Sequence, residues 1–120
     1  MEHNLWYDSS NEMARLEFNG DFLLSDVALM KEKLGKLLEG KPFKQIVIQM
    51  SDTGKVENRE TREQANQALK EAGINGIAFV GGSAANRMIA KVLVKTGTIN
   101  IQGDFFKNTE EAITWLKNRR

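Results

Sequence analysis

The sequence contains no cysteine, one proline and one histidine among its 120 residues. Without cysteine, disulfide bonds, thiolate metal sites and cysteine nucleophiles are all excluded. His3 lies close to the start of the chain, where we expect a frayed segment, so it makes a poor general base for a nucleophilic triad. The carboxylates show no metal-ligand spacing. We therefore expect a protein that is not an enzyme and that uses no cofactor or metal.

Charge of one sign is also lacking, because 17 lysines and arginines balance 16 acidic residues and leave a net charge of +1. Such a chain has no global field for DNA, RNA or an anionic membrane, so we expect no nucleic-acid partner. No apolar run approaches the roughly 18 residues of a membrane-spanning helix. The start "MEHNLWYDSS" lacks the positive flank and apolar run of a signal peptide. The default expectation is a cytoplasmic protein.

What the sequence does contain is the composition of a globular domain, with 41% hydrophobic and 28% charged residues. We expect a single domain over residues 1–120. Alternation in "MARLEF" indicates a half-buried strand, so residues 5–18 read as a hairpin. The β-branched run "QIVIQM" and the segment "GIAFV" are typical of buried strands, and "INIQG" predicts a final strand.

Four helices are expected between and after these strands. Ser25 can cap the first, whose apolar residues recur at helical spacing. The second, over residues 58–72, has only a thin apolar stripe, and the third begins near Ser83. Asn108 opens the last with capping-box spacing to Glu111. Acidic residues at helix starts, including Glu57, complement the helix dipole. Strands alternating with helices predict a mixed sheet with parallel pairs and an antiparallel hairpin at one edge.

The stretch "FVGGSAANR" allows two interpretations. A phosphate-binding loop usually adds a lysine and a hydroxyl to its backbone N–H groups, and no Gly-Lys-Ser/Thr sequence follows here. In the structural interpretation Gly82 adopts a conformation closed to other residues and Ser83 caps the next helix. The alternative is a weak anion site formed by Gly82, Ser83, Asn86 and Arg87.

Phe105 and Phe106 follow the last expected strand and cannot both point inward from an extended backbone. One of them is then exposed or lines a cleft with Leu23 and Met88, or else both pack through a local bend. Trp115, Phe18 and Phe79 are core residues by pattern.

Three segments resemble the SpoIIAA-like (STAS-like) bacterial domain family. They are "LWYDSSNEMARLEFNGDFLLSDVALMKEKL", "GIAFVGGSAANRMIAKVLVK" and "DFFKNTEEAITWLK", which together cover nearly the whole chain. The resemblance implies an α/β fold with a mixed sheet of four to five strands. An opening β-hairpin is followed by alternating strands and helices, and about four helices flank the sheet.

The resemblance also implies regulation through protein–protein contacts, with an unknown protein partner or a homodimer. Relatives of this kind are switched by phosphorylation of a serine in a motif close to Asp-Ser-Ser/Thr-Gly. Here Glu57-Asn58-Arg59-Glu60 occupies those places, so the usual phosphorylatable serine is absent. Asn58, Arg59 and the nearby hydroxyl of Thr61 are the candidate partner-surface and regulatory residues.

A second function follows from the kinship of this family with lipid carriers. The chain would then bind a small apolar, lipid-like or anionic ligand and associate reversibly with a membrane surface. The expected pocket lies between the helix after Ser83 and the helix over residues 58–72. Its candidate lining residues are Met50, Leu69, Met88, Val92 and Phe105.

Overall fold

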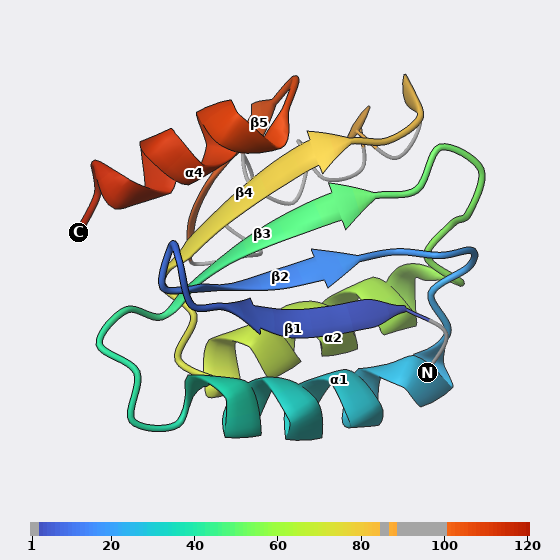
Figure 1. The fold of residues 1–120 in the computed structure, drawn as a ribbon. Coiled ribbons are helices and arrows are strands. Elements are labelled where there is room, and N and C mark those ends of the chain that lie inside the picture. The colour runs from blue at the N-terminus through green and yellow to red at the C-terminus, as the bar shows by residue number, and fades with distance from the viewer. Residues whose placement is uncertain (1–2, 85–86, 89–100) are drawn as a thin grey trace.

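A computed structural model describes residues 3–84, 87–88 and 101–120. At its centre lies a five-stranded sheet whose strands stand side by side in the order of the sequence (Figure 1). The first two strands are antiparallel, and each later strand is parallel to the one before it. The strands are β1 (Asn4–Asp8), β2 (Met13–Glu17), β3 (Gln45–Met50), β4 (Gly76–Gly81) and β5 (Gln102–Phe106).

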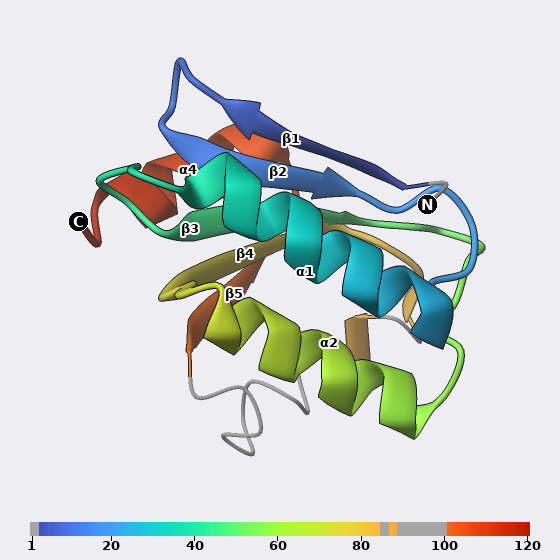
Figure 2. The ribbon, with the colours of Figure 1, turned by 90° about the horizontal axis from the view of Figure 1, so that it is seen from below.

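Helices cover both faces of this sheet. On one face α1 (Leu24–Leu38) and α2 (Arg59–Glu71) lie side by side, as Figure 2 shows from below. On the other face α4 (Thr109–Lys117) packs over β3, β4 and β5. Because both faces of β3 and β4 are covered, the residues of these strands form nearly continuous apolar runs, as parallel strands in such folds do.

The core has two layers, one on each side of the sheet. Side chains alternate along β2, so Ala14 and Leu16 face α1 while Met13 faces the side of α4. The larger layer, beneath α1 and α2, includes Phe22, Met30, Leu34, Leu38, Ile46, Ile48, Leu69 and Ile77. The smaller layer, beneath α4, includes Met13, Val47, Ala78, Val80, Ala112 and Leu116.

The last helix begins as the sequence predicts. The Asn108 side chain accepts a hydrogen bond from the Glu111 backbone N–H at 2.9 Å. A buried amide ties the helix to the sheet, because the Gln45 side chain donates to the Leu116 carbonyl at 2.7 Å. Trp115 is half-buried rather than a full core residue, with the Arg119 guanidinium 3.9 Å from its ring centroid.

The last strand corrects the expectation for the two phenylalanines. It runs from Gln102 to Phe106 and therefore includes them, whereas the sequence placed the strand earlier, on "INIQG". Phe105 stacks on Phe79 with ring centroids 5.2 Å apart, and Phe106 packs on Trp115 at 5.4 Å. They lie on opposite faces of an extended strand, and since helices cover both faces, both are half-buried without a local bend.

The expected fold class is confirmed: a mixed five-stranded sheet with an opening hairpin, followed by alternating strands and helices. The helix predicted after Ser83 falls largely on residues outside the described ranges. Within those ranges, no helix combines the length and the apolar character required to cross a lipid bilayer.

Candidate functional site

Two loops meet at the end of the sheet where β2 and β3 finish, and we call residues 18–23 and 51–58 the paired loops. A short parallel bridge joins them: the Phe22 N–H donates to the Lys55 carbonyl and the Glu57 N–H donates to the Phe22 carbonyl, both at 2.8 Å. The Asp21 carboxylate accepts from the Lys55 N–H at 2.8 Å. The backbones approach so closely that a Cβ on Gly54 would overlap the carbonyl oxygen of Gly20 in the opposite loop. The paired loops therefore behave as one unit.

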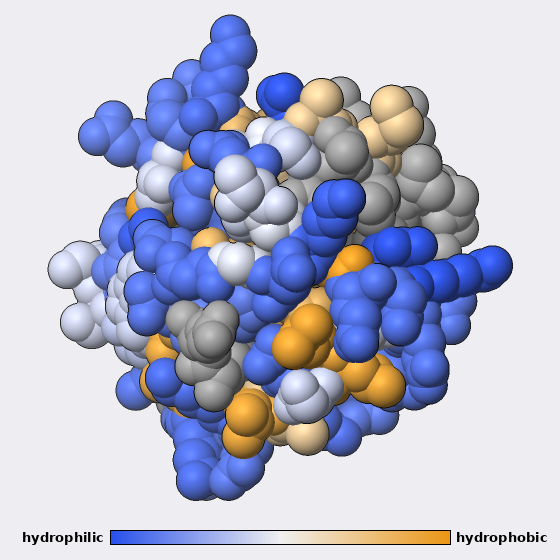
Figure 3. Space-filling view, turned by 90° about the vertical axis from the view of Figure 1, so that its right-hand side faces the viewer, coloured by the Kyte–Doolittle hydropathy of each residue, from blue (hydrophilic) through white to orange (hydrophobic). Residues whose placement is uncertain are grey.

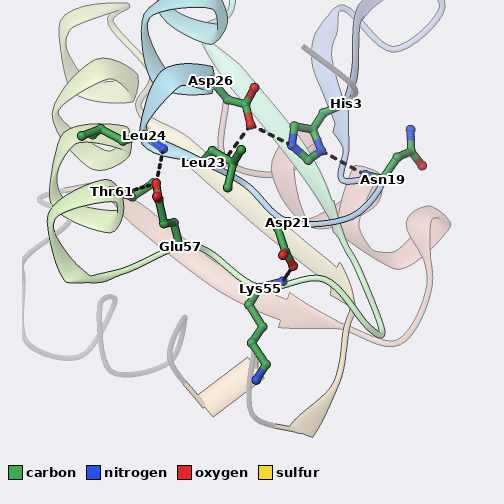
Figure 4. Close-up of polar contacts among 9 residues, drawn as sticks. All are labelled: His3, Asn19, Asp21, Leu23, Leu24, Asp26, Lys55, Glu57 and Thr61. Carbon is green, nitrogen blue, oxygen red and sulfur yellow. Dashed lines mark hydrogen bonds and ion pairs between the residues drawn. The ribbon is translucent and has the colours of Figure 1, made fainter.

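The first turn of α1 is capped by carboxylates rather than by a serine. The Asp26 carboxylate accepts from the Leu23 N–H at 2.9 Å, and the Glu57 carboxylate, from the other loop, accepts from the Leu24 N–H at 2.7 Å (Figure 4). The helix begins at Leu24 with Leu23 as its N-cap, so the expectation of a Ser25 cap is wrong. Negative charge at this position satisfies unpaired N–H groups and complements the helix dipole.

His3 belongs to the same cluster, although the sequence placed it in a frayed tail. Its side chain is fully buried, and its ring contacts Phe18 and Phe22 with centroids 5.3 Å apart. The Asn19 backbone N–H donates to Nδ1 at 3.0 Å, so the ring proton sits on Nε2, which donates to the Asp26 carboxylate at 3.3 Å. Figure 4 shows this chain of contacts. The imidazole thus links the start of the chain to the cap of α1, and we call His3, Asp26 and Glu57 the capping cluster.

The three partner-surface candidates lie at the start of α2, and the structure separates them. Asn58 is exposed and is the N-cap, accepting from the Thr61 N–H at 2.9 Å. Arg59 is also exposed and pairs with Glu63 at 3.1 Å. Thr61 is fully buried, and its hydroxyl donates to the Asn58 side chain at 3.0 Å. The expectation that Thr61 belongs to an accessible surface is therefore corrected.

A groove runs between the two helices next to the paired loops. Its volume is about 310 Å³. Its floor includes the buried side chains Val27 and Ala68, and an ion pair between Lys31 and Glu71 lies at its far end. Hydrogen bonds from Lys31 and Gln67 lower the pKa of the Glu71 carboxyl. We call this feature the α1–α2 groove; its lining residues are Leu24, Val27, Ala28, Lys31, Gln64, Gln67, Ala68 and Glu71.

Leu24 lines the groove at the start of α1, and Leu23 precedes it in the chain; we call these two residues the groove mouth. Leu23 is 42% exposed and Leu24 is 39% exposed. Figure 3 looks onto this end of the molecule and shows hydrophobic side chains exposed within a largely hydrophilic surface. The sequence suggested only that Leu23 lines a cleft with Met88 and an aromatic residue.

In the glycine turn after β4, Gly82 has the backbone conformation that the structural interpretation requires. Gly82 has φ +89°, and a Cβ there would lie 2.8 Å from the Met50 Cβ. The Arg87 N–H donates to the Ser83 carbonyl at 2.9 Å, as in a helical turn, and Arg87 is exposed. Asn86, the fourth residue of the candidate anion site, lies outside the described residues.

The described members of the expected apolar pocket differ in their surroundings. Met50 and Leu69 are buried in the core beneath α1 and α2, Phe105 is half-buried on Phe79, and Met88 is 66% exposed. Val92 lies outside the described residues. Nor does any group of three or more His, Asp or Glu side chains in the described ranges form a possible metal site.

The groove and the capping cluster are the features that sequence reasoning missed. A lone histidine near the start of a chain carries no periodic signal, and a carboxylate that caps a helix from another loop cannot be assigned from spacing. A signal for the groove does exist. Leu24, Ala28 and Lys31 share one helical face, as do Gln64, Gln67 and Glu71. These two faces become a groove only once the helices are known to lie side by side.

Comparisons with known proteins agree with this fold. A comparison with curated proteins gives no match. Among solved structures, the chain is similar to an uncharacterized protein of the DUF3478 family with a SpoIIAA-like fold from Shewanella loihica PV-4. The two share 14% sequence identity with a TM-score of 0.68, over 95% of this chain and 91% of that one. The expected SpoIIAA-like fold is confirmed. Residues 22–120 match a domain of unknown function, DUF7793, and the chain belongs to that family.

Proposed function

We propose that this chain is a non-enzymatic interaction module that acts through protein–protein contacts, made at the α1–α2 groove and its mouth. The observation that carries the proposal is the exposure of two adjacent leucines on a rigid support. Leu23 and Leu24 each leave about two-fifths of their surface in water. Full burial of such a side chain is worth about 1.5–3 kcal/mol, so leaving both exposed sacrifices stability that a partner could recover.

The support under these leucines is what separates them from scattered surface residues. Leu23 and Leu24 each donate their backbone N–H to a carboxylate, one of them from the opposite loop. The bridge between the paired loops fixes the same segment from behind. A surface held in one arrangement before binding loses little conformational entropy when a partner docks. Rigidity and exposed apolar area together favour a contact surface.

The lining of the groove suits a polypeptide. Val27, Ala28 and Ala68 offer apolar area for aliphatic side chains, and a volume of about 310 Å³ holds one or two of them. The amides of Gln64 and Gln67 along one wall can both donate to and accept from a peptide backbone. The usual phosphorylatable serine is absent from this chain, so the contact we propose does not depend on that switch.

The test compares Leu24→Glu with Met88→Glu, which changes a more exposed apolar side chain that does not line the groove. Each protein is immobilised, and the proteins retained from an extract of its own host are quantified by mass spectrometry. We expect at least one protein to be retained by the wild type and by Met88→Glu but lost with Leu24→Glu. Calorimetry with that purified protein should then show binding at least about tenfold weaker, a loss of about 1.4 kcal/mol.

Two results would count against this function. In one, Leu24→Glu, still folded by circular dichroism, retains the same proteins as the wild type. In the other, native mass spectrometry of protein purified from its host shows a bound small molecule that Leu24→Glu leaves in place. The second result would favour the ligand-binding alternative.

A further inference from the structure

A second surface, distinct from the α1–α2 groove, lies along the free edge of β1, the first strand of the sheet. Figures 1 and 2 show this strand at the border of the sheet, with no described element outside it. Its pairing with β2 is continuous from Asn4 to Asp8, without a bulge. Exposed edges in natural proteins are usually protected by lysine, proline or a bulge. The strand sequence "NLWYD" carries no such protection.

Large apolar side chains are exposed along this edge. Trp6, in the middle of β1, is 38% exposed, and the Arg15 guanidinium lies 5.2 Å from its ring centroid. Leu29 on α1 is 48% exposed. It lines a shallow hollow of about 290 Å³ together with His3, Glu32, Lys33 and Lys36. Since His3 directly precedes β1, this flank of α1 lies next to the free edge.

We propose that this edge is the interface between two copies of the chain, related by a two-fold axis with their β1 strands antiparallel. Directly opposite residues in an antiparallel pair point to the same face of the sheet. The register with the longest overlap places Trp6 opposite the partner's Trp6, Asn4 opposite the partner's Asp8, and Leu5 opposite the partner's Tyr7. In this register the Asn4 amide lies opposite the carboxylate of the partner's Asp8, and the two Trp6 indoles pack against each other. No two residues of like charge lie opposite each other along the paired strands.

The same axis brings the two α1 helices together. In Figure 1, α1 runs in the same direction as β1, so the partner's α1 is antiparallel to it. Three residues of strand from His3 to Trp6 span about 10 Å, a length that about seven helical residues match. Because His3 contacts Asp26, the axis crosses α1 close to residues 32 and 33. Glu32 then faces the partner's Lys33, so the flank is complementary in charge to its own copy.

The first test uses the absence of native cysteine. Trp6→Cys would carry a single thiol, and opposite Cβ atoms in an antiparallel pair lie about 4.5–5.5 Å apart, close enough for a disulfide with small adjustments. The matched control is Ser10→Cys, an exposed position in the turn between β1 and β2. Under mild oxidation we expect Trp6→Cys to form covalent dimer at least about tenfold faster than the control. Equal rates would overturn the proposal.

The second test exchanges the charges on α1 and measures self-association by sedimentation. We expect the wild type to dimerise at micromolar concentration and Lys33→Glu to weaken the dimer about tenfold, which corresponds to about 1.4 kcal/mol. The double variant Glu32→Lys/Lys33→Glu restores the opposed charges and should return to within about threefold of the wild type. A wild type that stays monomeric at micromolar concentration, or a double variant as weak as Lys33→Glu, would refute the interface.

These tests are separate from that of the proposed function, because the two surfaces lie on opposite flanks of α1. Leu24→Glu should leave the dimer unchanged, and Lys33→Glu should leave the partner bound at the groove. Loss of one behaviour without the other therefore identifies which inference has failed.

Discussion

Replacement of His3 tests whether the capping cluster contributes to stability. In His3→Ala the Asn19 N–H loses its acceptor, and the Asp26 carboxylate loses one donor while keeping the Leu23 N–H. The ring contacts with Phe18 and Phe22 are lost as well. His3→Phe keeps a ring of similar size in this place but removes both polar contacts. Together the two variants separate packing from hydrogen bonding.

The expected magnitudes follow from these contacts. The Asn19 N–H is part-buried, so the loss of its acceptor, together with the loss of one donor to the Asp26 carboxylate, costs about 1–3 kcal/mol. The more favourable burial of a phenyl ring offsets part of this in His3→Phe, so we expect that variant to lose about 1 kcal/mol. His3→Ala adds the loss of ring packing, for a total of about 3 kcal/mol. A domain stable by about 5–15 kcal/mol remains folded in both cases.

Urea denaturation followed by tryptophan fluorescence measures both losses, and the m value should stay constant if the unfolded state is unchanged. A double-mutant cycle with Asp26→Ala isolates the pair, and we expect a coupling free energy of about 0.5–1.5 kcal/mol. The exposed Asn75→Ala, in the turn between α2 and β4, serves as the control and should change stability by less than about 0.5 kcal/mol. The reasoning is refuted if His3→Phe is as stable as the wild type, or if Asp26→Ala costs the same with and without His3.

Three further substitutions test the structure. Burial raises the pKa of the Asp8 carboxyl, but hydrogen bonds from Asn11 and Arg15 together lower it by more than burial raises it. The net pKa therefore lies below the ordinary value. Asp8 therefore stabilises the protein above about pH 4, and this contribution disappears as the pH falls through the lower folded-state pKa. Asp8→Asn should cost about 1 kcal/mol at pH 7 and progressively less in acid, as measured by urea midpoints across that range; a difference independent of pH would contradict the assignment. Gly35→Ala, in the last turn of α1 with open space around it, should stabilise by about 0.5–1 kcal/mol, whereas Gly54→Ala must push the paired loops apart and should destabilise by at least about 2 kcal/mol. Thermal melts of the two glycine variants measure the expected gain and the expected loss of stability in one assay.

The elements that sequence reasoning located are those specified by local patterns. The hairpin follows from alternation, α4 from the spacing of Asn108 and Glu111, and the end of α2 from Gly73, whose φ is +85°. The last strand was placed too early, because "INIQG" alternates between apolar and polar residues and the true strand, "QGDFF", does not. Pairing with β4, which places Phe79 opposite Phe105, fixes its position, and that contact is made in the tertiary structure.

The candidate site was less predictable, since its residues are brought together by loops and by neighbouring helices. Thr61 reads as a surface hydroxyl, yet it is buried because Asn58 and Glu57 hold its side chain. Met50 and Leu69 read equally well as pocket or core, and the packing of α1 and α2 makes them core. The anion and pocket candidates at Asn86 and Val92 remain predictions.

The cap that Glu57 supplies to α1 also bears on the order of folding. Glu57 and Leu24 are 33 positions apart in the sequence, so the first turn of α1 cannot be completed until β3 is paired and the loop after it is in place. The middle of α1, around Met30 and Leu34, needs only local helix formation and apolar collapse. Helix growth in this chain would then nucleate centrally and finish at its own beginning. In kinetic terms, removal of the Glu57 carboxylate should mainly speed unfolding and leave the folding rate nearly unchanged.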